Sequence, residues 1–509
     1  MSHSSSHSDT VPTRPRRPLR ELLLTGSAYS LAATAIAQGI ALLTSILYAR
    51  LLGPNNLGIL AIFTQIASVA VAFGGLGLGS SVTKFVAETR SLDPMKLEKL
   101  VSTVLVVGLV ASLSVSILLF YLAGLLAVEY RSADLGLMLR LSSFVIVLNV
   151  LSSSGSAILQ GFQEIRRLSA LGIAIEAMSV PVIFVSLTAL GLVGAAVAGV
   201  VLTVVSSCLI FGSAWRCLRH EHLKFHFEFH KESFRSLVRF TLPLLGSLLV
   251  LRLAALFQTS FLALSLGFVE TGMFKVATTL YHVVLLVPSA LGVPLLPAMA
   301  ELYASAPADR AKRSVTTLIR LAVYAGVPVA LAVGFVAKPL IAILYGTDYV
   351  GASVLVFILS IAGFADIVGI VAFNTALGEG RTGLILSVDL VQTFVIVVGT
   401  VVLVNMFGLI GIGFAVLANS IVYGATILTL LARSNRLEWR GVFSALTLAA
   451  GALSFAVFAF LWGNVQVNLW LGGVVVATIV FVFWRRLEPH EKSIVKAALR
   501  MLGSRMWLR

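Results

Sequence analysis

Long apolar stretches separated by short polar segments run through the chain from residue 22 to residue 484. A helix needs about 20 predominantly apolar residues to cross the hydrocarbon core of a bilayer. Fourteen stretches meet this requirement, and they predict transmembrane helices over residues 22–49, 57–80, 100–126, 136–160, 168–190, 192–214, 237–264, 271–299, 316–336, 352–377, 383–404, 408–431, 442–462 and 468–484. The pattern therefore predicts an all-α polytopic membrane protein.

Glycine patterns in the first half of the chain recur in the second half. Leu52-Gly53 with Gly58 recurs as Leu266-Gly267 with Gly272, at one constant offset. Gly191 with Gly194 recurs as Gly408 with Gly411, at a constant and slightly longer offset. Six spans in each half, an even number, make the halves parallel repeats, a common plan in transporters. We expect two six-helix lobes followed by two further helices.

The polar segments divide the chain into six parts. The first is predicted to be a disordered tail, the third an interfacial linker and the last an amphipathic tail with basic residues at four-residue spacing. The parts are the tail 1–21, the N-lobe 22–214, the linker 215–236, the C-lobe 237–431, the last two spans 432–484 and the tail 485–509.

Charge sets the expected orientation of the chain. Hydrophobic residues make up 58% of the sequence and charged residues 12%, whereas soluble domains carry roughly 25% charged residues. The formal net charge is +15, but the basic residues lie in alternate short loops rather than on one soluble domain, which argues against nucleic acid as a partner. Only Arg50, Arg131 and Lys338 lie in the other set of loops. By the positive-inside rule, both termini are expected to be cytoplasmic.

Motifs for catalysis and cofactors are missing from the sequence. It contains no P-loop, no nucleophile elbow and no loop long enough for a catalytic domain, so we expect neither an enzyme nor a nucleotide-driven motor. Cys208 and Cys217 are expected to be ordinary small side chains. The histidines of linker 215–236, with Glu221, suggest a zinc site, but an interfacial linker explains the same residues. We therefore expect no metal and no cofactor.

Several motifs resemble one known family. In the first half they are Arg50-Leu51-Leu52-Gly53-Pro54, and Gly75-Leu76-Gly77-Leu78-Gly79-Ser80-Ser81 running into Lys84-Phe85-Val86-Ala87-Glu88. In the second half they are Gly272-Met273-Phe274-Lys275-Val276-Ala277, Pro297-Ala298-Met299, and Leu344-Tyr345-Gly346 before Tyr349. In this order the motifs resemble the polysaccharide flippases of the multidrug/oligosaccharidyl-lipid/polysaccharide exporter superfamily, over nearly the whole chain beyond residue 20.

The resemblance implies two lobes in a V around a central cavity, which is exposed to each side of the membrane in turn. It implies translocation of a polyprenyl-phosphate-linked oligosaccharide across the cytoplasmic membrane of a prokaryote, for the assembly of cell-surface glycan. Expected partners are this lipid-linked substrate, membrane lipids, and a glycan polymerase or glycosyltransferases; we expect the chain to be a monomer. Two positions depart from the family: relatives often carry an acidic residue where this chain has Gly75 and Gln258.

Arg252 is the leading candidate for binding the substrate phosphate. It lies near the middle of span 237–264, where a guanidinium is costly unless it faces a wet cavity or a partner. Its planar fork suits phosphate, and helical spacing places Thr241 and Thr259 on the same face. The alternative is a buried ion pair with Asp366 or Glu176. Four more cations complete the predicted cationic cavity, each with snorkelling to the interface as its alternative: Lys275, Arg239, Arg140 and Arg320.

Two carboxylates lie within predicted spans, Asp366 and Glu176. Either could couple transport to H⁺ or Na⁺, or pair with an arginine. Other hypotheses stay open: a flippase for peptidoglycan precursor, a multidrug exporter of the same superfamily, or a non-transporting scaffold of a glycan assembly complex. A drug exporter is expected to have acidic cavity groups and twelve spans, which this sequence does not favour.

Overall fold

The computed structural model describes residues 19–89, 94–220, 230–285, 308–378, 384–433, 437–462, 465–489 and 491–492. Within these ranges the chain is helical, and the described part contains no strand. Most of the predicted tail 1–21, the middle of the linker 215–236 and the end of the tail 485–509 lie outside the described residues.

The first half of the chain contributes α1 (Leu19–Gly75), α2 (Leu78–Thr89), α3 (Pro94–Glu129), α4 (Ala133–Ser143), α5 (Val145–Gly161) and α6 (Ile165–His220). The second half contributes α7 (Lys231–Ser265), α8 (Phe268–Val284), α10 (Ala308–Leu344), the 3₁₀ helix η1 (Thr347–Ala352), α11 (Ser353–Gly378), α12 (Leu384–Phe407) and α13 (Leu409–Arg433). Two helices follow, α14 (Trp439–Trp462) and α15 (Val465–Arg486).

Two helices, α1 and α6, are too long to cross a bilayer only once. At 1.5 Å per residue, the 57 residues of α1 would span about 85 Å, far more than the roughly 30 Å of hydrocarbon. Each has one break at a glycine in the left-handed region, Gly53 (φ 72°) in α1 and Gly191 (φ 57°) in α6. A residue without a Cβ adopts this conformation without strain, so each helix turns back there.

Membrane-spanning character is confirmed for the described part of the chain. It contains nine helices long and apolar enough to cross a membrane, or ten if the bent pair α4 and α5 forms one span. All fourteen predicted stretches lie in the described helical part, apart from residue 383 and the end of stretch 271–299, which lie in undescribed segments. The helices extend beyond the apolar stretches, as in α10, which starts at Ala308 with a polar, basic turn.

The predicted repeat is visible in the backbone. Gly191 and Gly408, which correspond in the two halves, have φ of 57° and 59° and both lie at a helix reversal. A methyl group on Gly194 would lie 2.0 Å from the carbonyl oxygen of Ser186, and one on Gly411 would lie 1.9 Å from that of Leu403. The two contacts are related by the same offset, so the two reversals have the same construction.

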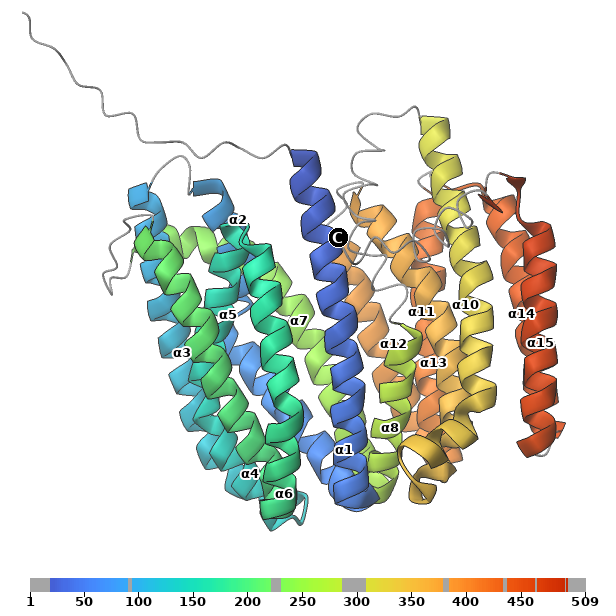
Figure 1. Ribbon diagram of the computed structural model, residues 1–509, viewed down its shortest axis with the longest axis horizontal. Coiled ribbons are helices and arrows are strands. Elements are labelled where there is room, and N and C mark those ends of the chain that lie inside the picture. The colour runs from blue at the N-terminus through green and yellow to red at the C-terminus, as the bar shows by residue number, and fades with distance from the viewer. Residues whose placement is uncertain are drawn as a thin grey trace, which may run out of the picture.

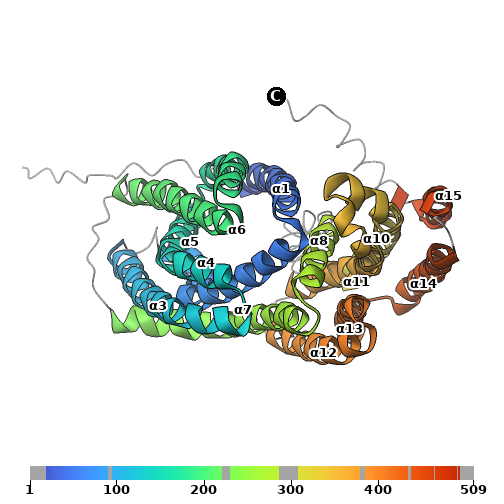
Figure 2. The ribbon, with the colours of Figure 1, turned by 90° about the horizontal axis from the view of Figure 1, so that it is seen from below.

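The two halves meet where α1 crosses α8 (Figures 1 and 2). A methyl group on Gly58 would lie 1.9 Å from the carbonyl oxygen of Phe268, and one on Gly272 would lie 2.1 Å from that of Pro54. Because Gly58 corresponds to Gly272 and Pro54 to Phe268, the two contacts are the same contact with its partners exchanged. Backbones can approach this closely only where neither helix carries a side chain.

Hydrophobic packing differs between the two ends of the helices. We name the end that carries most Lys and Arg residues the basic face, and the end with the breaks at Gly53, Gly191 and Gly408 the opposite face. One buried cluster near the opposite face contains residues of both halves, for example Leu57 and Tyr349. Nearer the basic face there are two separate clusters, one of second-half residues and one of first-half residues together with Leu237 of α7. Apart from α7, the described residues of the two halves therefore share a buried cluster only toward the opposite face.

Three helices hold distinctive positions. α7 belongs to the second half, yet it packs on α1, α2 and α3 as well as on α12, and runs along one side of the molecule (Figure 2). The last two helices, α14 and α15, pack mainly on α10 at the edge of the molecule (Figure 1).

The glycine crossing gives a test of the fold. Replacement of Gly272 by Ala forces α1 and α8 apart, and overpacking of this kind costs about 1–3 kcal/mol. We expect a lower apparent Tm in detergent. Gly39→Ala is the matched control, because nothing lies within 4 Å of that position and alanine favours the helix. Equal Tm values for the two variants would contradict the crossing.

Candidate functional site

A cavity of about 440 Å³ lies between α7 and the first half of the chain. This volume falls within the usual range of small-molecule sites, roughly 300–1,000 Å³. The cavity is lined by α1 and α2 residues on one side, Ser153 of α5, and Leu248 and Arg252 of α7. The lining from α1, α2 and the turn between them consists of Phe63, Thr64, Ala67, Ser68, Val71, Ala72, Gly75, Gly77, Leu78 and Gly79.

Helical spacing explains how α7 presents Arg252 to this cavity. Thr241, Leu248 and Arg252 follow each other at seven and four residues, so they lie on one stripe. The hydroxyls of Thr241 and Ser81 of α2 are hydrogen-bonded to each other, and both residues are buried. This bond fixes the rotation of α7 about its axis, and Arg252 therefore faces α1 and α2. Thr259, predicted on the same face, is also buried.

Arg252 has no counter-charge among the described residues. No carboxylate there lies within ion-pair distance of it, and its side chain is exposed. Gly75 lines the same cavity, and nothing lies within 4 Å of its Cβ position. The described lining contains no acidic residue. The cavity can therefore attract an anion, and its small and hydroxyl-bearing side chains leave room for polar groups.

Lys275 lies between the two halves of the chain. It shares a stripe of α8 with Gly272, which touches Pro54 of α1, and with Thr279, which accepts a hydrogen bond from Ser45 of α1 at 3.3 Å. Lys275 is thus on the side of α8 that faces α1. It is half-buried, and no described carboxylate pairs with it.

Asp366 is held by hydroxyl groups rather than by a cation. Its Oδ2 accepts hydrogen bonds from Tyr281 of α8 and, at 2.8 Å, from Ser420 of α13. Its environment therefore lies inside the second half, between α8, α11 and α13. The other candidate carboxylate, that of Glu176 on α6, is half-buried and has no ion-pair partner within the described ranges. Neither acid pairs with Arg252.

Two of the predicted cavity cations lie elsewhere. Arg140 is exposed on α4, with its guanidinium 5.9 Å from the ring centre of Phe120. Arg320 on α10 forms an ion pair with Glu488 at 2.6 Å and another with Glu491 at 3.4 Å, in the segment after α15. The structure therefore does not bring these two residues to Arg252. The backbone of Arg239 belongs to α7, but its side chain lies outside the described set.

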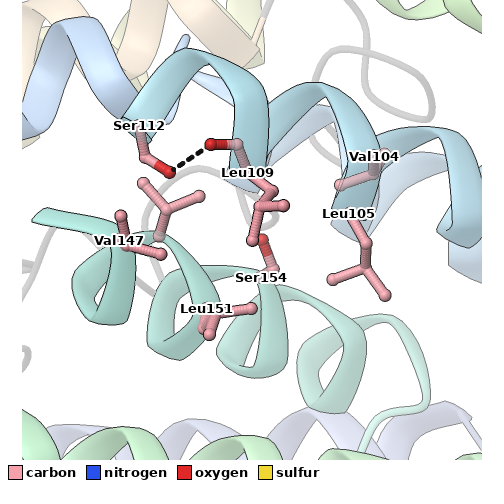
Figure 3. A pocket seen from close by; sticks show the side chains of 8 residues that line it. Val104, Leu105, Leu109, Ser112, Val147, Leu151 and Ser154 are labelled. Carbon is pink, nitrogen blue, oxygen red and sulfur yellow. Dashed lines mark hydrogen bonds between the residues drawn. The ribbon is translucent and has the colours of Figure 1, made fainter. Parts of the chain in front are cut away.

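A second contact, between α3 and α5, is closed (Figure 3). Val104, Leu105 and Leu109 meet Val147, Val150 and Leu151 there, and two serines complete the lining. One of these, the Ser112 hydroxyl, donates to the carbonyl oxygen of Leu109 at 3.0 Å. The crevice has no space for a water-sized molecule. This contact is packed core rather than a binding site.

The sequence alone did not identify the partners of Asp366 or those of Arg320. Tyr281 and Ser420, which bind Asp366, lie 85 and 54 residues from it along the chain, and no local pattern links them. The acids that pair with Arg320 stand three residues apart, a spacing that places both on one face of a helix. That spacing was the available signal for Glu488 and Glu491.

Comparison with known proteins identifies the fold and then the family. The helical architecture has the same fold as the solved structures of MurJ and of a MATE transporter. The model of a family described as "Polysaccharide biosynthesis protein" matches residues 23–303. The chain therefore belongs to the polysaccharide biosynthesis protein family. No curated protein matches it.

Solved structures show the same fold at low sequence identity. The lipid II flippase MurJ, in an inward closed conformation, is 14% identical with a TM-score of 0.70, and the match covers 90% of this chain and 99% of MurJ. An inward-facing multidrug resistance MATE transporter is 17% identical with a TM-score of 0.65, and the match covers 85% of this chain and 98% of that transporter. A MOP superfamily transporter from Pyrococcus furiosus is 16% identical with a TM-score of 0.60, and the match covers 86% of this chain and 97% of that transporter.

The Asp366 cluster gives a test of the site geometry. Asp366→Ala leaves the Tyr281 and Ser420 hydroxyls without their acceptor, and an unmade hydrogen bond at a buried group costs about 1–3 kcal/mol. We expect a clear fall in apparent Tm in detergent. Asp309→Ala, at an exposed position in the first turn of α10, is the control and should change little. An unchanged or higher Tm for Asp366→Ala would rule out the bonding described here.

Proposed function

We propose that this protein is a flippase that translocates a polyprenyl-phosphate-linked oligosaccharide across the cytoplasmic membrane of a prokaryote by alternating access, for assembly of cell-surface glycan. The two halves act as lobes, and the cavity that they enclose is exposed to each side of the membrane in turn. The basic face is the cytoplasmic side, because Lys and Arg residues are retained there. The family membership supports a lipid-linked sugar as the cargo.

The observation that carries this proposal is the guanidinium of Arg252 in its cavity, without a counter-charge from the described residues. A phosphate headgroup needs a positive charge and water if it is to cross hydrocarbon. Arginine supplies bidentate, charge-assisted hydrogen bonds to phosphate oxygens, which are stronger than bonds between neutral groups. Since the described lining contains no acid, Arg252 can offer its full fork to the substrate.

Lys275 extends the cationic path toward the opposite face. It lies seven residues after Phe268, the first residue of α8, which is a distance of about 10 Å along the helix. Arg252 lies about 20 Å before Ser265, the last residue of α7. The two cations therefore stand at successive depths. A phosphate released by Arg252 meets a second positive charge before it reaches the opposite face.

Rival functions differ in their cargo. A peptidoglycan-precursor flippase is the strongest, because MurJ, a lipid II flippase, shares the fold. A multidrug exporter of cations fits less well, since the described lining of the Arg252 cavity offers no acid. A non-transporting scaffold has no need of a cavity that presents a guanidinium.

Transport in proteoliposomes tests the role of Arg252. With a defined polyprenyl-diphosphate oligosaccharide, Arg252→Ala is expected to reduce flipping roughly 10- to 100-fold, because a hydrogen bond to a charged group contributes about 1.5–3 kcal/mol. Arg252→Lys keeps the charge but not the planar fork, so its flipping rate should lie between those of the unmodified protein and Arg252→Ala. Gly75→Glu should also reduce flipping, since its carboxylate competes for the guanidinium, and its neutral isostere Gly75→Gln should reduce it much less.

Lipid II offered in the same assay separates the two flippase hypotheses. Faster flipping of lipid II than of every oligosaccharide substrate would favour the peptidoglycan role. Normal flipping by Arg252→Ala at normal expression would contradict the proposed phosphate-binding role of Arg252.

We further propose that Asp366 couples transport to H⁺ or Na⁺. Its two hydroxyl partners orient the carboxylate without neutralising it, so it can take up a cation. Asp366→Asn keeps an acceptor oxygen for Tyr281 and Ser420 but cannot be charged. We expect this variant to flip substrate at a rate independent of an imposed pH or Na⁺ gradient, whereas the unmodified protein responds to one of them. A response of equal size in both would exclude Asp366 as the coupling group.

A further inference from the structure

Two motifs that resemble the flippase family, residues 50–54 and 344–349, do not line the Arg252 cavity. They contact each other at the opposite face. The first includes the break in α1, and the second follows the end of α10. Arg50 donates from Nε to the carbonyl oxygen of Leu344 at 2.8 Å and from Nη2 to that of Ile343. Tyr349 donates from its hydroxyl to the carbonyl oxygen of Ala49 at 3.0 Å.

Both contacts satisfy carbonyl groups at helix ends. The last four carbonyls of a helix have no partner within it, and α10 ends at Leu344. In α1 the helical geometry is interrupted at Gly53, so Ala49 lies in the last turn before the break, where carbonyls lose their helical partners. The first half thus caps a helix of the second half, and the second half caps a helix of the first. A guanidinium at a helix C-terminus also complements the helix dipole.

The two caps differ in their contact with water. Tyr349 is 1% exposed, packed within the cluster that both halves share, whereas Arg50 is exposed. If the halves separate at this face, water can bond to the released carbonyls and to Arg50. Breaking the caps therefore has a low cost, which suits a contact that must form and break repeatedly.

The geometry points to a latch: the motifs 50–54 and 344–349 are reciprocal helix caps that hold the opposite face closed, and their release opens it. This inference rests on the alternating access proposed above, and it assigns a role to motifs outside the substrate path. The glycine crossing of α1 and α8 lies next to the latch and is formed by backbone without side chains, so it can act as the pivot while the caps break.

Distance measurements between spin labels test the latch without a transport assay. Labels are placed at Val128→Cys at the end of α3 and Met406→Cys at the end of α12, both exposed, in a Cys208→Ser/Cys217→Ser background reconstituted in nanodiscs. In the unmodified protein we expect mainly one short distance. Tyr349→Phe should raise the ratio of long to short distances about fivefold, as expected for loss of one net hydrogen bond, and Arg50→Ala, which removes two hydrogen bonds, should raise it at least as much.

Lys338→Ala is the matched control, because it removes an exposed cation of α10 that lies outside both motifs. It should leave the distances unchanged. Tyr349→Phe keeps the buried ring and removes one hydroxyl, so it remains informative if Arg50→Ala does not fold. Unchanged distances in Tyr349→Phe and in every folded Arg50 variant would overturn the latch, as would an equal shift in Lys338→Ala.

The outcomes also separate the latch from the transport proposal. Shifted distances in a protein that flips no lipid-linked glycan would support the latch and remove the proposed cargo. Normal flipping together with unchanged distances would support the proposed cargo and overturn the latch.

Discussion

The close crossing of α1 and α8 is the constraint on which the arrangement of the two halves depends. At Gly58 and Gly272 each backbone lies against a carbonyl of the other helix, so the halves are fixed in depth and angle at that level. The shared apolar cluster and the bonds from Arg50 and Tyr349 gather around this level. Toward the basic face the described clusters connect the halves only through α7, whose Leu237 joins the first-half cluster, and the Arg252 cavity opens between α7 and α1.

Charge within this framework is distributed unevenly. The cations of the proposed path, Arg252 and Lys275, have no carboxylate partner among the described residues, whereas the acid inside the second half, Asp366, is held there by hydroxyls. Arg320, which is not at the cavity, is paired twice. Unpaired charge inside an apolar protein is costly, so its position at the cavity or at the contact between halves is a functional signal.

Much of this could be predicted from the sequence, because hydrophobic length and glycine offsets are local properties. The apolar stretches, the reversals at Gly191 and Gly408 and the face of Arg252 follow from length, spacing and 3.6-residue periodicity. Helical periodicity shows which side of a helix is polar, but not which helix lies opposite. The partners of Asp366 and Arg320, and the position of Arg140 beside Phe120, therefore required the three-dimensional structure.

The exchange of partners at the glycine crossing also bears on the history of the chain. When residue i of one unit touches residue j of another, and j touches i in return, the interface is isologous, as in a two-fold dimer. Gly58 with Phe268 and Gly272 with Pro54 satisfy this relation within a single polypeptide. The crossing thus keeps the geometry of a homodimer of six-helix subunits. Fusion of the two copies freed them to diverge, so that the second carries Arg252 and Lys275 at the positions where the first has Gln38 and Ala61.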